Sequence, residues 1–118
     1  MARVVSIATD LMLASRVDAG LTAAGHHVVL ASSLAAAPLD EVELIVADLD
    51  VESAEALVAT GLPVLGYYSH VDTETRALAE AAGVDLVVPR SRMSRELPDL
   101  VQRLLRTSPG NTPPDAFG

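Results

Sequence analysis

Residues 44–50 read Leu-Ile-Val-Ala-Asp-Leu-Asp, an apolar run of four residues followed by Asp48 and Asp50. A continuous apolar run of this length, without polar alternation, is typical of a strand buried on both faces of a parallel sheet. Asp48 follows the run directly, so we expect its carboxylate at the carboxyl end of that strand. The segment predicts a central strand that delivers charged side chains to one edge of a sheet.

Similar short apolar segments alternate with helix-forming segments on both sides of this central strand. The other expected strands cover residues 4–8, 27–31, 63–67 and 86–88, and the expected helices cover residues 11–24, 51–60, 73–82 and 95–106, with one or two further helical turns between 32 and 38. Asp50 and Ser94 are the expected N-caps of two of these helices. Gly25 and Gly83 stand where left-handed C-caps are expected.

Alternating strands and helices predict an α/β fold with right-handed crossovers. We expect a flavodoxin-like three-layer sandwich, in which a five-stranded parallel sheet of order 2-1-3-4-5 carries helices on both faces. In such sheets the functional crevice lies outside the carboxyl ends of the strands. This rule directs attention to the loops that follow the first, third, fourth and fifth strands.

The length of 118 residues fits one domain, which we expect over residues 1–106. Hydrophobic residues make up 50% of the chain but aromatic residues only 3%, so the core must consist mainly of Ala, Val and Leu. Residues 107–118 hold three of the seven prolines and have no apolar period, which predicts a disordered tail or a linker.

The charge pattern excludes several classes of function. Sixteen acidic residues against eight basic ones give a net charge of −8, which disfavours direct nucleic-acid binding by this chain. All eight basic residues are arginines, so chemistry that needs a lysine amine is excluded, and the absence of cysteine excludes thiol catalysis. No apolar run is long enough for a membrane span, and we expect a cytoplasmic protein that is not an enzyme.

Asp10 and Asp48 follow the first and third strands, which are neighbours in the expected strand order, so their carboxylates should approach each other. Two carboxylates with a backbone carbonyl and waters suit Mg²⁺, which is the only cofactor we expect to be possible. A plainer interpretation remains open, in which Asp10 caps the first helix and Asp48 or Asp50 caps the third.

From Arg3 to Arg106 the chain resembles the receiver domains of bacterial response regulators, which act in two-component signalling and phosphorelays. That family carries an acidic pair after the first strand, a phosphoacceptor Asp after the third, a Ser or Thr after the fourth, and a Lys-Pro dipeptide after the fifth. The resemblance implies that Asp48 is the phosphoacceptor. It places Tyr68, with Ser69 one residue later, at the hydroxyl switch position.

This chain departs from the family pattern in the residues that support phosphoryl transfer. The acidic pair is reduced to Thr9-Asp10, and Pro89-Arg90 stands where Lys-Pro is expected. Arg90 is the candidate anion-binding residue at that position, but a planar guanidinium is not interchangeable with an ammonium. The pattern favours a degenerate receiver, or pseudo-receiver, with phosphorylation lost or altered.

Three functions stay open on the sequence. The first is a non-catalytic signalling module that binds a protein partner, or a second copy of itself, through the face formed by the fourth strand, the helix after it, the fifth strand and the last helix. The second is a receiver in which Asp48 is phosphorylated with the help of Mg²⁺. The third is a flavodoxin-like domain that binds a small ligand in the same crevice.

Overall fold

The computed structural model describes residues 2–68 and 73–107 of the chain. Five strands form one parallel sheet in the order β2-β1-β3-β4-β5, which confirms the predicted topology. The strands are β1 (Arg3–Ile7), β2 (His27–Ala31), β3 (Leu44–Asp48), β4 (Val64–Tyr68) and β5 (Leu86–Pro89), and the α-helices are α1 (Leu11–Ala23), α2 (Ala54–Val58), α3 (Thr73–Ala82) and α4 (Arg90–Thr107).

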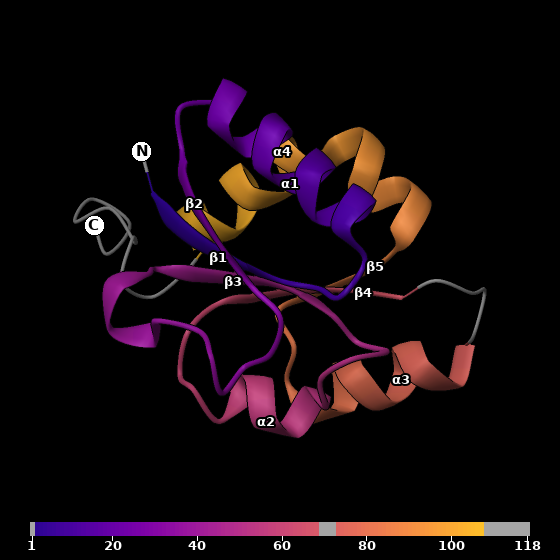
Figure 1. Cartoon of the computed structure of the whole chain (residues 1–118). Coiled ribbons are helices and arrows are strands. Elements are labelled where there is room, and N and C mark those ends of the chain that lie inside the picture. The colour runs from indigo at the N-terminus through magenta and orange to yellow at the C-terminus, as the bar shows by residue number, and fades with distance from the viewer. Residues whose placement is uncertain (1, 69–72, 108–118) are drawn as a thin grey trace, which may run out of the picture.

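The helices cover the two faces of the sheet in pairs, as Figure 1 shows. On one face α1 and α4 lie side by side, and on the other α2 and α3 lie together. Each face has its own core, because alternate residues of a strand point to opposite sides. Leu44 and Val46 of β3 belong to the core under α1 and α4, whereas Ile45 and Ala47 belong to the core over α2 and α3.

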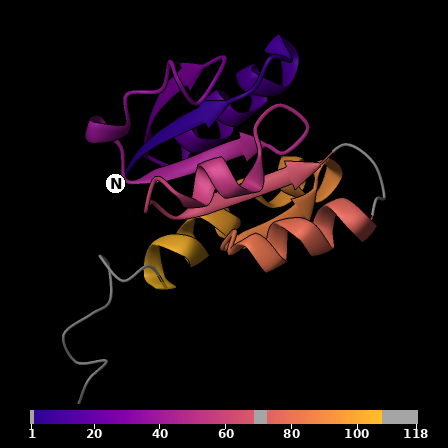
Figure 2. The ribbon, with the colours of Figure 1, turned by 90° about the horizontal axis from the view of Figure 1, so that it is seen from below.

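The segment between β2 and β3 contains no α-helix, so the regular alternation of five strands with five helices is incomplete. Tight turns at residues 33–37 and a short 3-10 helix, η1 (Leu39–Glu41), connect the two strands. Leu34, Ala37 and Leu39 from this connection still pack against the core on the α2 and α3 face. The view from that side places α2 and α3 away from β2 (Figure 2), which leaves the connection to cover this part of the sheet.

Two predicted helix starts are wrong. Ser53, not Asp50, caps α2, because the Ser53 hydroxyl accepts a hydrogen bond from the backbone N–H of Ala56 at 3.2 Å. Ser94 caps nothing, because α4 begins at Arg90 immediately after β5 and Ser94 lies inside the helix. Pro98 consequently lies in the interior of α4 and not in its first turn.

The predicted glycine C-caps after α1 and α3 are confirmed. Gly25 has φ +92° and Gly83 has φ +102°, and both follow the last turn of a helix. After α3 the N–H of Val84 donates to the carbonyl of Ala79 and that of Gly83 to the carbonyl of Glu80, which is the Schellman pattern.

The last helix of the structure extends slightly beyond the predicted domain. The last helix includes Thr107, one residue into the predicted tail, and residues 108–118 lie outside the described part of the structure. Among the described residues, no helix is long and apolar enough to cross a bilayer.

Replacing Gly83 with alanine should lower the free energy of unfolding by about 1 kcal/mol, because a Cβ is strained at positive φ. Gly20 is the matched control, since it lies inside α1 and its added Cβ would meet Leu97 at an ordinary 3.7 Å. Gly20→Ala should raise stability by about 0.5–1 kcal/mol through helix propensity. Urea denaturation of both variants checks the pair, and equal effects of the two substitutions would contradict the assigned caps.

Candidate functional site

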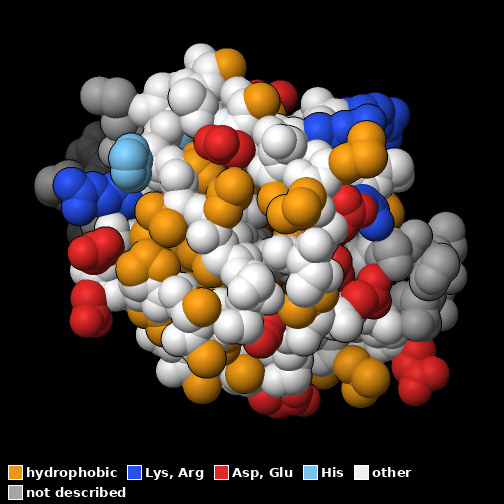
Figure 3. Space-filling view, viewed as in Figure 1, with side chains coloured by type: hydrophobic (Ala, Val, Ile, Leu, Met, Phe, Trp, Pro, Cys, Tyr) orange, Lys and Arg blue, Asp and Glu red, His pale blue; other side chains and the backbone are white. Residues whose placement is uncertain are grey.

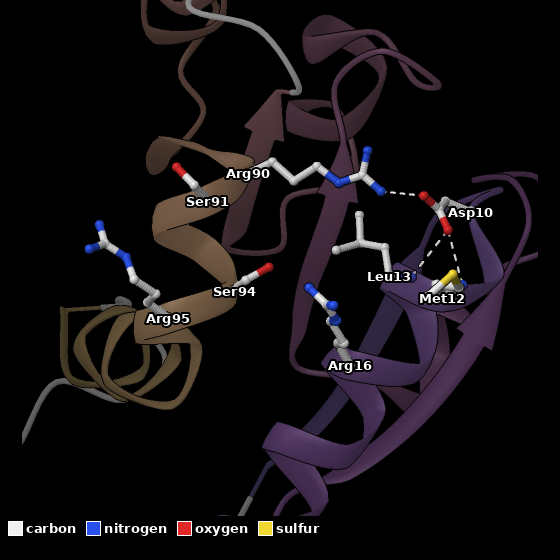
Figure 4. A pocket seen from close by; sticks show the side chains of 8 residues that line it. All are labelled: Asp10, Met12, Leu13, Arg16, Arg90, Ser91, Ser94 and Arg95. Carbon is white, nitrogen blue, oxygen red and sulfur yellow. Dashed lines mark hydrogen bonds and ion pairs between the residues drawn. The ribbon is translucent and has the colours of Figure 1, made fainter.

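The carboxyl ends of the strands bring together three of the charged residues singled out from the sequence. Asp10 follows β1, Asp48 ends β3, and Arg90 starts α4 directly after β5. Although β3 and β4 separate β1 from β5 in the sheet, α1 and α4 are neighbours on one face. Arg90 and Asp10 therefore stand at the facing first turns of two adjacent helices, and their side chains meet (Figure 4).

Both carboxylate oxygens of Asp10 are engaged. Oδ1 accepts hydrogen bonds from the backbone N–H groups of Met12 at 3.0 Å and Leu13 at 3.2 Å, which confirms that Asp10 caps α1. Oδ2 forms an ion pair with Nη2 of Arg90. The hydrogen bond from Arg90, followed by the bond from the Leu13 N–H, holds the pKa of the Asp10 carboxyl below its ordinary value.

Asp48 has the opposite electrostatic environment. Its side chain is only 8% exposed, and Oδ1 accepts a hydrogen bond from the backbone N–H of Asp50 at 2.9 Å. Burial raises the pKa of the Asp48 carboxyl, and the nearby carboxylates of Asp50 and Asp10 act in the same direction, whereas Asp50 N–H and Arg90 oppose it. The Asp48 bond to Asp50 forms a tight turn after β3 and not the start of α2.

The two tyrosines that end β4 point to opposite faces of the sheet. Tyr68, the residue aligned with the switch position, packs in the core on the α2 and α3 face. Tyr67 packs under α1 and α4 and is in register with Asp48. Ser69, the second predicted switch residue, lies outside the described residues.

Tyr67 is the residue that the sequence did not single out. Its ring is fully buried, and its hydroxyl makes no hydrogen bond to any residue that the structure describes; the buried hydroxyl of Ser6 in β1 shares this condition. Burial, and next the charge of Asp48, raise the pKa of Tyr67 well above its ordinary value. Strand parity relative to Asp48 is the sequence signal that identifies Tyr67, because paired residues on neighbouring strands share a face.

The described residues do not fit a resident Mg²⁺ ion at this crevice. Mg²⁺ requires carboxylate oxygens that are free to coordinate it, in near-octahedral geometry. Here Asp10 is occupied by two N–H groups and a guanidinium, and one oxygen of Asp48 is occupied by the Asp50 N–H. Across residues 2–68 and 73–107, no group of three or more His, Cys, Asp or Glu side chains is placed to hold a metal.

Solved structures are similar to this chain, although no protein-family model and no curated protein sequence matches it. NtrX from Brucella abortus aligns with 91% of this chain at 21% identity and a TM-score of 0.79, and the chain spans 28% of that protein. A response regulator receiver domain protein from Clostridium thermocellum aligns over 88% of this chain and 94% of its own, at 14% identity and a TM-score of 0.74.

A third similar structure is HP1043, an orphan response regulator of H. pylori. It aligns over 88% of this chain and 96% of its own, at 20% identity and a TM-score of 0.75. These likenesses establish that the chain has the fold of a response regulator receiver domain. At such identities they establish the fold alone.

Substituting Asp48 and Asp10 by asparagine should change stability in opposite directions at neutral pH. The pKa of Asp48 is raised in the folded state, so ionised Asp48 lowers the stability of the protein at neutral pH. Because Asp48→Asn removes this charge, it should stabilise the protein by up to about 1 kcal/mol at pH 7. The Asp10 pKa is lowered, so ionised Asp10 contributes stability above its unfolded pKa, and Asp10→Asn should destabilise the protein.

Urea denaturation at pH 7 and at about pH 4.5, which lies near the ordinary aspartate pKa, measures both effects. The advantage of Asp48→Asn should shrink as the pH falls through the folded pKa, and it should vanish below the unfolded pKa, where wild-type Asp48 is protonated in both states. A stabilisation that does not depend on pH would contradict the burial argument for Asp48.

Proposed function

We propose that this protein is a non-catalytic cytoplasmic signalling module of the receiver type that works without phosphorylation of Asp48. The observation that carries the proposal is the ion pair between Arg90 and Asp10. This ion pair occupies the carboxylate of Asp10, which would have to help hold Mg²⁺. It also occupies the guanidinium of Arg90, the cation that follows β5.

The electrostatics of phosphoryl transfer support this proposal. An aspartate that attacks phosphorus needs cations around the phosphoryl oxygens, because negative charge accumulates there in the transition state. At this crevice the guanidinium of Arg90 already pairs with Asp10, and the raised pKa of Asp48 shows that its surroundings favour the neutral carboxyl. Both features oppose the chemistry at the position where the resemblance places it.

The alternative is a phosphorylatable receiver, in which Arg90 leaves Asp10 and pairs with a phosphoryl group on Asp48. One observation favours it: the positive charge of Arg90 acts on the Asp48 carboxyl and lowers its pKa against the effect of burial. In that function an oxygen of Asp48 forms a bond to phosphorus while the donor's leaving oxygen departs with the bonding electrons.

Incubation with acetyl phosphate and Mg²⁺, followed by intact-mass spectrometry, separates the two functions. We expect no phosphoryl adduct on the wild-type chain, because Asp10 and Arg90 neutralise each other. Arg90→Lys is an informative second variant, since it restores an ammonium beside the crevice. A stoichiometric adduct on the wild type that Asp48→Asn abolishes would establish the phosphorylatable receiver instead.

We propose further that the module binds through the face formed by β4, α3, β5 and α4, and that its partner is a second copy of the chain. Leu78 of α3 supports this choice, since 62% of this large apolar side chain is exposed. Arg76 and Glu80 flank it as an ion pair of 3.3 Å on the same helix. A two-fold contact centred on Leu78 would place Arg76 of one copy opposite Glu80 of the other, as a self-complementary interface requires.

Light scattering after size-exclusion chromatography tests this interface over a range of protein concentrations. We expect a monomer–dimer equilibrium that Leu78→Glu weakens by at least about tenfold, because the substitution places a charge at an apolar contact. Leu30→Glu is the control, since Leu30 is 49% exposed on β2, away from this face. A strictly monomeric wild type would show that the partner is a different protein.

A further inference from the structure

A groove runs between the first turns of α1 and α4, beside the ion pair of Asp10 and Arg90. Its volume is 620 Å³, which lies within the range of pockets that hold small molecules. Figure 4 shows Arg16 of α1 and Ser94 of α4 pointing into the gap between the helices, while Arg90 crosses one end of it. Ser91 and Arg95 line the same groove from the outer side of α4.

The groove is positively charged in a strongly acidic protein. Its lining holds three guanidinium groups and one carboxylate, whereas the whole chain carries a net charge of −8. In the space-filling view, arginine side chains gather over the ends of α1 and α4 next to exposed hydrophobic groups (Figure 3). A local reversal of charge of this kind attracts anions.

Two arginines of the groove, Arg16 and Arg95, differ from Arg76 and Arg92 of the same set of helices. Arg76 and Arg92 each form an ion pair with a glutamate one turn later, at 3.3 Å. Arg16 and Arg95 are exposed, and neither forms an ion pair with any described residue. Arg16 points into the groove from α1, whereas Arg95 lies on the outer side of α4, so the exposed Arg95 side chain brings a second guanidinium group to a ligand by turning toward the gap (Figure 4).

The start of α4 adds hydrogen-bond donors to these cations. The first N–H groups of a helix have no partner inside the helix, and the first turn of α4 contains no acidic residue. The hydroxyl of Ser94 points into the gap, and Ser91 lines the border of the groove on the outer side of α4 (Figure 4). The Arg16 guanidinium, the Ser94 hydroxyl and these N–H donors match the several oxygens of a phosphate better than the two oxygens of one carboxylate.

An apolar border completes the groove on the side of α1. Met12 lines it with 73% of its side chain exposed, and the adjacent Leu11 is 82% exposed. A flexible thioether packs well against organic groups of varied shape. The groove thus combines two cationic positions with an adaptable apolar edge.

We propose that the groove between α1 and α4 binds a small organic diphosphate. Arg16 contacts one phosphate group from α1, and the exposed Arg95 side chain turns from the outer side of α4 to contact the other. Ser94 donates to the phosphate oxygens, and Met12 packs against the organic part. The Asp10–Arg90 ion pair forms one end of the groove and stays intact. This site does not depend on whether Asp48 is phosphorylated.

Isothermal titration calorimetry on the full chain tests the site with inorganic pyrophosphate, uridine diphosphate, uridine and succinate. We expect pyrophosphate and uridine diphosphate to bind, uridine diphosphate more tightly because of its organic part, and uridine and succinate not to bind. Arg16→Gln and Arg95→Gln should each weaken diphosphate binding by at least about tenfold, the loss of one charge-assisted contact. Circular dichroism verifies that these exposed variants fold.

Arg76→Gln and Arg92→Gln are the matched controls, because they remove the same charge from arginines that do not line the groove. They should leave diphosphate binding unchanged. A dissociation constant of about 1 mM corresponds to a binding free energy of about 4 kcal/mol. If neither diphosphate binds with at least this affinity, the proposal is overturned. Equal losses in all four arginine variants, or succinate binding as tight as pyrophosphate binding, would overturn it as well.

Discussion

The burial of β3 on both faces determines where polar chemistry can occur in this protein. All five residues of the strand are buried, and apolar side chains from helices on both sides cover it. A strand in this position cannot carry a charged side chain along its length without a large desolvation cost. Charged groups are therefore confined to its end, where Asp48 emerges but is still only 8% exposed.

The same constraint gives the two aspartates of the crevice different properties. Asp10 lies at a helix start, half-exposed, where two N–H groups and a guanidinium stabilise its negative charge. Asp48 lies deeper, with one hydrogen bond from the described residues, and beside it on the neighbouring strand is the hydroxyl of Tyr67, which has no partner in that part of the chain. The guanidinium of Arg90, which follows β5, consequently pairs with Asp10 and not with Asp48. A crevice arranged in this way stabilises the fold at Asp10 and leaves an electrostatic cost at Asp48.

The strands and two of the helix ends were predictable because each depends on a local signal, and the strand order followed from the general topology of α/β sheets. Apolar runs identify strands, and Gly25 and Gly83 identify helix ends, since positive φ favours glycine. Helix starts were less predictable, because Ser53 competes with Asp50 for one of them and α4 follows β5 without a separate cap. Strand parity selects Tyr67 over Tyr68 only once the register of β4 against β3 is known, because a shift of one residue in a strand moves a side chain to the other face.

The arginine-lined groove shows most clearly how packing creates a site that sequence distance conceals. Arg16 is isolated in the sequence from every other arginine of the groove. On α1 the buried positions Leu13, Val17 and Leu21 fix which stripe faces the sheet, and on α4 Met93, Leu97 and Leu100 do the same. Arg16 on α1 and Ser94 on α4 lie beside these buried stripes and point into the space between the two helices, whereas Ser91 and Arg95 lie on the outer side of α4 (Figure 4). The packing that covers β3 therefore also determines the position of the groove and the charge that lines it.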